Sequence, residues 1–233
     1  MITNRKIEKY LSSARINAYR QFLLNLGIKE DEIDCKIREL YIWNIQTSSA
    51  FLEFFSFYEV ALRNAILFCV EHIHRYSLLD SRFIQSLPLK HRTNLLNIIN
   101  DISGENYEYQ HNRPLKIDTS KVNINTVIAK LNFHFWEFLL SSSYSSRYLT
   151  HHYRKSFKNA KSALKIKQIH RITAEIRELR NRVCHNEPIF KKPYLKRLYF
   201  KALIVLKLID EELSVFVALN TGRLNEELNR KWY

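Results

Sequence analysis

The sequence predicts an all-α fold, a bundle with long core helices, on three observations. Glycine contributes only 3 and proline only 4 of the 233 residues, so the two strongest breakers of regular structure are nearly absent. A β-rich chain of this length would need many tight turns and therefore more of both residues. Apolar side chains also recur three and four residues apart over long stretches, as on one face of a helix. We therefore expect a single helical domain over residues 1–233.

The first long helix is expected between Gly27 and Pro88, a stretch that holds neither breaker. Apolar residues recur there at helical spacing, which predicts one very long helix or two abutting ones. Aromatic side chains are dense enough to cover more than one face. A bundle core explains this density better than a platform for stacking nucleic-acid bases. The aromatic residues concerned are Trp43, Phe51, Phe54, Phe55, Phe57 and Tyr58.

Polar and periodic stretches alternate in the rest of the chain. Residues 100–121 hold Gly104 and Pro114 in a polar run, which predicts a surface loop. Helical periodicity resumes at Val127 and is expected to break at residues 141–146. Further helices are predicted at about residues 161–185 and 194–219. The first of these two carries an apolar seam formed by Ile166, Ile169, Ile172, Ile176, Leu179 and Val183.

The chain is strongly basic, with 37 lysines and arginines against 23 acidic residues and a formal net charge of +14. Such an excess attracts nucleic-acid phosphate or an anionic membrane. Nucleic acid is the better expectation, because the longest clean apolar run, Ala202 to Leu206, is far short of the roughly 20 residues of a membrane span. The polar start of the sequence shows no secretory signal. We expect a cytoplasmic protein that does not bind membranes.

The cysteines and histidines indicate neither a disulfide framework nor a metal site. The three cysteines are an odd number and include no C-x-x-C pair. The nine histidines include two close pairs, but no flanking cysteine or H-E-x-x-H arrangement accompanies them. No metal and no cofactor is therefore expected. The residues considered are Cys35, Cys69, Cys184, His72, His74, His151 and His152.

The segment that carries chemistry runs from Leu179 to Phe190 and reads LRNRVCHNEPIF. It places Arg180 four intervening residues before His185, which is the R-x4–6-H pattern of HEPN domains. The string resembles the Abi-like family of bacterial abortive-infection proteins, in which Arg-Asn-Arg precedes two small or apolar residues and His-His-Glu-Pro. The chain departs from this pattern at Asn186, where relatives often carry a second histidine.

The resemblance covers most of the chain. Residues 40–44 (LYIWN) and 58–65 (YEVALRNA) resemble the family's first long helix, residues 133–136 (FHFW) its aromatic segment, and residues 10–15 (YLSSAR) also fit. The resemblance implies a HEPN-like bundle, a homodimer, and an endoribonuclease that acts as an anti-phage toxin. It also implies cleavage that leaves a 2′,3′-cyclic phosphate and a 5′-hydroxyl. The sequence does not name a neutralising partner, which for such a toxin is an antitoxin or a small RNA.

The residue types suit this chemistry independently of the resemblance. Attack by the RNA 2′-hydroxyl needs a group that moves protons near neutral pH and a cation that stabilises phosphoryl charge, and histidine and arginine supply them without a metal. On an ideal helix, five residues at about 100° each place Arg180 and His185 about 140° apart, so they would not share a face. Two solutions stay open. Either the helix ends near His185, because Pro188 disfavours helical geometry at Glu187, or two subunits share a basic cleft.

Supporting side chains are expected on both predicted helices. Glu59 either forms a surface ion pair with Arg63, four residues on, or orients Arg180 or His185 from the facing helix. The polar neighbours of the motif either assist at the site or bond locally to backbone and solvent. The supporting candidates are Asn181, Glu187, Glu59, Arg63 and Asn64, and the RNA-binding candidates are Arg182, Lys191 and Lys192.

Two other functions stay open at this point. A non-catalytic RNA-binding protein that holds a specific partner RNA would bind with steep salt dependence and leave the RNA intact. A regulatory scaffold that senses nucleotides or inhibits a partner protein would bind nucleotides without affinity for RNA.

Overall fold

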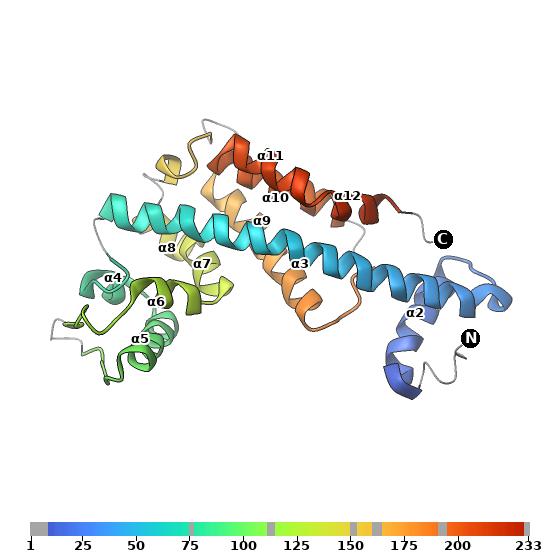
Figure 1. Ribbon diagram of the computed structural model, residues 1–233, viewed down its shortest axis with the longest axis horizontal. Helices are drawn as coiled ribbons and strands as arrows, with labels where there is room; N and C mark the ends of the chain where they lie inside the picture. The colour runs from blue at the N-terminus through green and yellow to red at the C-terminus, as the bar shows by residue number, and fades with distance from the viewer. Residues whose placement is uncertain are drawn as a thin grey trace.

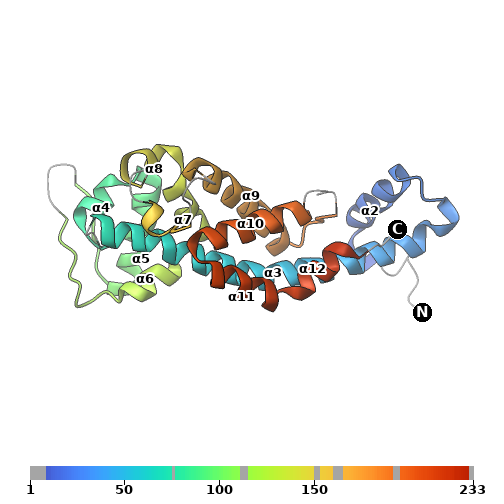
Figure 2. The same ribbon diagram turned by 90° about the horizontal axis from the view of Figure 1, so that it is seen from above.

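A computed structural model describes residues 9–74, 77–110, 115–149, 153–159, 165–190 and 195–230. All regular elements within these ranges are helices, which confirms the predicted all-α class. The molecule is elongated, and one helix runs along most of its length while the others pack around it (Figures 1 and 2).

The long helix is α3, which spans Glu30–His74 without interruption and is 45 residues long. At 1.5 Å per residue it extends for about 68 Å. Its first turn holds Glu30, Asp31 and Glu32, whose negative charges favour the N-terminal end of a helix dipole. The sequence left one helix or two abutting ones open, and α3 is a single helix.

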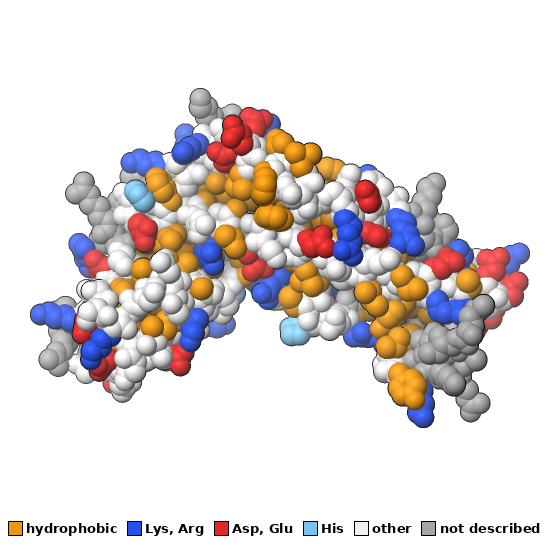
Figure 3. Space-filling model, in the orientation of Figure 1, with side chains coloured by type: hydrophobic (Ala, Val, Ile, Leu, Met, Phe, Trp, Pro, Cys, Tyr) orange, Lys and Arg blue, Asp and Glu red, His pale blue; other side chains and the backbone are white. Residues whose placement is uncertain are grey.

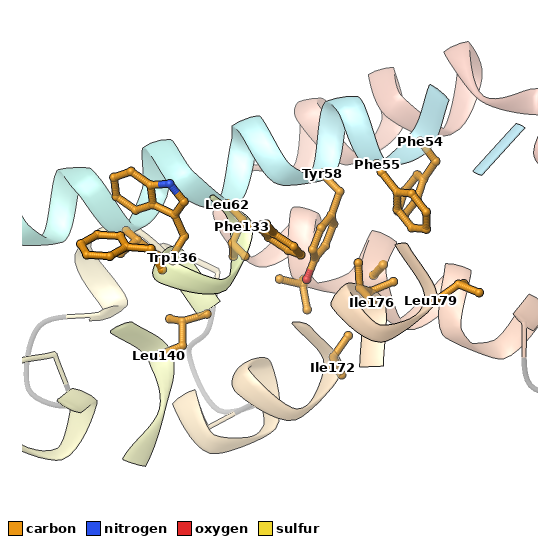
Figure 4. Packing of buried hydrophobic residues seen from close by; sticks show 14 of the residues in the cluster. Phe54, Phe55, Tyr58, Leu62, Phe133, Trp136, Leu140, Ile172, Ile176 and Leu179 are labelled. Carbon is orange, nitrogen blue, oxygen red and sulfur yellow. The ribbon is translucent and has the colours of Figure 1, made fainter. Parts of the chain in front are cut away.

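Most of the aromatic residues predicted to form a bundle core on α3 are buried, namely Trp43, Phe51, Phe54, Phe55 and Tyr58. Figure 4 shows Phe54, Phe55, Tyr58 and Leu62 pointing from α3 toward α7 (Phe133–Leu140) and α9 (Ile166–Cys184). All four side chains are buried. The Tyr58 hydroxyl hydrogen-bonds to the Thr173 hydroxyl of α9 at 3.0 Å, so the one polar side-chain atom of these four residues has a partner.

The other helices form groups at the two ends and along one side of α3 (Figure 1). One group gathers near the C-terminal end of α3, α2 packs near its N-terminal end, and three helices follow its length. The group consists of α4 (Ser81–Ser86), α5 (Leu89–Ser103), α6 (Ile124–Lys130), α7 and α8 (Ser142–Tyr148); α2 spans Ser13–Asn25, η1 Tyr153–Lys155, α10 Leu195–Ile209, α11 Glu211–Asn220 and α12 Gly222–Asn229.

Three boundaries differ from the sequence-based predictions. The helix predicted at residues 194–219 is two helices, because Asp210 adopts extended backbone and its carboxylate caps α11 by accepting from the Leu213 N–H at 3.0 Å. The break predicted at residues 141–146 is wrong beyond Ser141, since α8 begins at Ser142. The loop predicted from residue 100 begins at Gly104, where a left-handed φ of 71° ends α5.

Candidate functional site

The Arg180–His185 motif forms the last turns of α9. The seam predicted on this helix is buried, including Ile176, Leu179 and Val183. As expected, the helix ends at Cys184, and His185 is its C-terminal cap, with its N–H donating to the Asn181 carbonyl at 2.9 Å. The chain then reverses direction at Asn186, whose φ of 54° is left-handed. Asparagine adopts this conformation more readily than most residues.

The turn after α9 is anchored on both sides. The Ile189 N–H donates to the buried Asn44 side-chain oxygen of α3 at 2.7 Å. Arg182 donates to the Pro188 carbonyl at 2.9 Å and pairs with the Glu187 carboxylate at 3.2 Å. Arg182 and Glu187 therefore contact each other and the turn, and these contacts fix the backbone that carries His185.

Arg180 is held from the facing helix. Its Nε donates to the Glu59 carboxylate of α3 at 3.0 Å, and its Nη1 lies 3.5 Å from the Asn181 side-chain oxygen. Burial raises the pKa of Glu59, although the positive charge of Arg180 acts against this rise. Arg63 lies 3.5 Å from the Asn64 side-chain oxygen, so Glu59 contacts the arginine of α9 and not the one on its own helix.

Arg180 and His185 line two different pockets. Arg180, Glu59 and Arg63 line a pocket of about 230 Å³ with residues of α6 and α7. His185 lines a pocket of about 460 Å³ between α2, α3 and the end of α9. Figure 1 shows α9 projecting between the α4–α8 group and α2. The Arg180 pocket is lined by α3, α6 and α7, and the His185 pocket by α2 and α3. Neither of these two pockets contains both Arg180 and His185.

The His185 imidazole is exposed, and it has no hydrogen-bond partner among the residues that the structure describes. Its pocket also contains one cationic side chain, Arg15 of α2, and the hydroxyls of Ser48 and Ser49 on α3. This composition offers an imidazole, a guanidinium and neutral polar groups around one hollow.

The remaining candidates lie elsewhere. Asn64 lines a third pocket of about 550 Å³, which also contacts Lys155 and Lys158 and the junction of α10 and α11. Lys191 and Lys192 lie outside the described residues, as do His151, His152 and the side chain of His74.

A polar cluster around the buried Glu137 carboxylate, between α7 and α9, was not predicted from the sequence. The Glu137 carboxylate accepts hydrogen bonds from His134 at 3.1 Å, His170 at 2.6 Å and Arg177 at 3.0 Å. Burial alone would raise the pKa of Glu137, but the histidine hydrogen bonds and the charge of Arg177 outweigh it and lower the pKa to about 2. The available signal was a lone carboxylate in the otherwise apolar end of α7, WEFLL.

The basic excess is not gathered in one groove on the face shown in Figure 3, where lysine and arginine side chains alternate with acidic ones. In the described part of the chain, no three histidine, cysteine or acidic side chains cluster in a way that suits a metal ion. None of the helices described is both long and apolar enough to cross a bilayer. Comparison with family models, curated proteins and solved structures gave no match.

Proposed function

We propose that this protein is a metal-independent endoribonuclease of the HEPN type that acts as an anti-phage abortive-infection toxin. The observation that carries the proposal is the placement of His185, an exposed imidazole on an anchored turn at a polar pocket that also holds an arginine. The formal net charge of +14 supports RNA as the substrate, because phosphate contacts supply much of the affinity for nucleic acid.

The proposed reaction uses the RNA's own nucleophile. The His185 imidazole accepts the proton of a 2′-hydroxyl, whose oxygen attacks the adjacent phosphorus and forms a 2′,3′-cyclic phosphate. The bond from phosphorus to the 5′-oxygen breaks, and that oxygen takes a proton from water to become a 5′-hydroxyl. The His185 imidazolium gives its proton to the hydroxide that remains, which regenerates the base. Guanidinium groups stabilise the charge on the phosphoryl oxygens by forked donation. No step needs a metal ion or a cofactor.

A homodimer explains how Arg180 would take part. Within one chain, Arg180 and His185 line two different pockets. A two-fold pair with its motifs facing across a shared basic cleft would bring Arg180 of one subunit to the RNA bound at His185 of the other. Such a pair also has the self-complementary interface that two-fold symmetry requires.

A second candidate function is RNA binding without cleavage. It is favoured by the same separation of the two side chains, because a monomer with this geometry would grip phosphate at Arg180 without placing it beside His185. In this case purified protein would bind RNA with a steep salt dependence and leave it intact.

The deciding experiment compares wild type with His185→Ala on mixed RNA in the presence of a chelator, with mapping of the RNA ends. We expect cyclic phosphate and 5′-hydroxyl ends from wild type, and a rate lower by about 10²- to 10⁴-fold for the variant, as for loss of a general acid–base group. His72→Ala is the matched control, because His72 is an exposed histidine near the far end of α3. Equal cleavage by His185→Ala and wild type would refute the catalytic assignment.

A further inference from the structure

We propose that Arg15 is the phosphate-binding residue of the His185 pocket, and that this pocket takes one nucleotide of single-stranded RNA. The inference rests on the proposed function, and it assigns a cation of the same chain to the phosphate that lies beside His185. Arg15 and His185 are 170 positions apart in the sequence but line one pocket of about 460 Å³.

Arg15 is held in place by its own helix. Ser12 caps α2 by accepting from the Arg15 N–H at 3.3 Å. The adjacent Ile16 and Tyr19 are buried, and Tyr19 packs against Tyr41 of α3 and Phe190, with ring centroids 5.1 and 4.6 Å apart. Phe190 belongs to the segment that follows His185, so the same contacts that dock α2 also place Arg15 relative to the end of α9.

The guanidinium of Arg15 is available to a ligand. Among the described residues it has no ion-pair partner, whereas Arg20 on the same helix pairs with Glu30 at 3.1 Å and Asp34 at 2.8 Å. Arg180 is likewise engaged, by Glu59 at 3.0 Å. An unpaired, half-buried guanidinium is only partly hydrated, which favours binding of an anion over binding of water.

The lining of the pocket favours an anionic ligand with an apolar part. None of its described lining residues is acidic, so nothing there competes with phosphate for Arg15. Ser48, Ser49 and Asn186 offer neutral donors and acceptors suited to ribose hydroxyls and base edges. Tyr41, Ile45 and Leu52 supply an apolar wall on which a base can lie. Together these groups match a nucleotide better than a free inorganic anion.

The size of the pocket, about 460 Å³, also favours single-stranded RNA over a duplex. A base within a duplex is stacked on both sides, whereas an unpaired nucleotide can turn its base and its phosphate into one hollow. The flexible unpaired chain also lets the 2′-oxygen align with the adjacent phosphorus for in-line attack.

The test uses Arg15→Ala, Arg15→Lys and the control Arg154→Ala, in which an exposed arginine of η1 is removed. Arg154 is remote from the pocket, because Ser156, directly after η1, hydrogen-bonds to Cys69 of α3, whereas the pocket uses residues 41–52 of that helix. Each protein is first checked for an unchanged helical circular-dichroism spectrum. Binding is then measured with a 2′-O-methyl oligoribonucleotide, which has no free nucleophile, and cleavage with the matching unmodified oligoribonucleotide.

We expect Arg15→Ala to lower the cleavage rate by about 10- to 100-fold, the size of a lost charge-assisted contact. The slope of log affinity against log salt concentration should also become shallower by about 0.7, which is the value for one phosphate contact on a single strand. Arg15→Lys should keep the slope and recover only part of the rate, because lysine keeps the charge but loses the fork. Arg154→Ala should match wild type in both measurements.

The outcomes separate this inference from the proposed function. Wild-type cleavage and an unchanged salt slope for Arg15→Ala would overturn the role of Arg15 and leave the endoribonuclease standing. A reduced salt slope with no cleavage by wild-type protein would support the nucleotide pocket and refute the proposed reaction. Absence of both binding and cleavage in wild type would overturn both.

Discussion

At the scale of single residues, the arginines near the motif differ in what surrounds them. Arg180 is fixed by Glu59, Arg182 holds the turn through Pro188 and Glu187, and Arg15 faces a pocket without an acidic side chain. An arginine that already has a protein partner mainly holds neighbouring groups in position. An arginine without such a partner can bind an anion.

Replacing Glu59 tests whether the carboxylate positions Arg180. Burial raises the pKa of Glu59, so its charged form costs folding free energy at neutral pH, and Glu59→Gln should leave stability within about 0.5 kcal/mol of wild type or raise it. The amide attracts the guanidinium less, so we expect RNA cleavage to fall about tenfold. Thermal unfolding and cleavage assays measure the two effects. Unchanged cleavage in a stable Glu59→Gln protein would show that Glu59 has no positioning role.

At the scale of elements, α9 is held on two sides by polar contacts added to its apolar seam. Tyr58 of α3 hydrogen-bonds to Thr173 of α9. The Glu137 carboxylate of α7 accepts hydrogen bonds from His134 of α7 and from His170 and Arg177 of α9. Three hydrogen bonds compensate the burial of one carboxylate, which would otherwise destabilise the helix pair. The cluster therefore fixes the rotation of α9, and with it the directions of Arg180 and His185.

The Glu137 cluster predicts a loss of stability in acid. The pKa of Glu137 is lowered to about 2 from an ordinary value of 4.5, so its contribution is fully present above about pH 4.5 and is lost as the pH falls toward 2. A lowering of this size corresponds to on the order of 3 kcal/mol. Chemical denaturation from pH 7 to 2 should show a smaller decline for Glu137→Gln than for wild type. Parallel declines would contradict the assignment.

The end of α9 predicts a second effect on stability. Asn186 has a φ of 54°, which β-branched residues adopt at high cost, so Asn186→Val should destabilise the protein by about 1 to 2 kcal/mol. Asn186→Gly should keep the stability, because glycine adopts this conformation without strain. Urea denaturation of both variants measures the difference. Equal stability of the two would show that the turn rearranges without cost.

At the scale of the whole molecule, α9 divides the surface that would bind RNA. One pocket opens toward α6 and α7 and the other toward α2, and Figure 2 shows how far α2 lies from the α4–α8 group. On the face shown in Figure 3, apolar side chains gather over α10 and α11. Val215, Phe216 and Leu219 are exposed there, with 77% of Leu219 accessible. Patches of this kind often mark contacts between proteins.

Mixing two inactive variants tests whether the site is shared between subunits. If Arg180 of one subunit acts with His185 of the other, unfolding and refolding Arg180→Ala together with His185→Ala should restore up to about a quarter of wild-type activity, since half of the dimers are mixed and each holds one intact site. Light scattering should show a dimer. No recovery on mixing, or a monomer that cleaves RNA at every concentration, would contradict a shared site.

The sequence alone determined the helical class, the long helical stretch after Gly27, the seam of α9 and the end of α9 near His185, but not that the long stretch is one helix and not two. These features follow from local periodicity and from the placement of glycine and proline, which act over a few residues. A single capping residue is a weaker signal than a long apolar repeat. The apolar spacing of residues 194–219 predicted one helix, whereas Asp210 caps a second helix within this stretch.

Only the tertiary structure decided which distant residues meet. It placed Glu59 against Arg180, Glu137 between two helices, and Arg15 in the pocket of His185. These neighbours depend on the direction that each helix takes after a turn and on which faces pack together. Such choices arise from burial summed over the whole core, and no local pattern of residues records them.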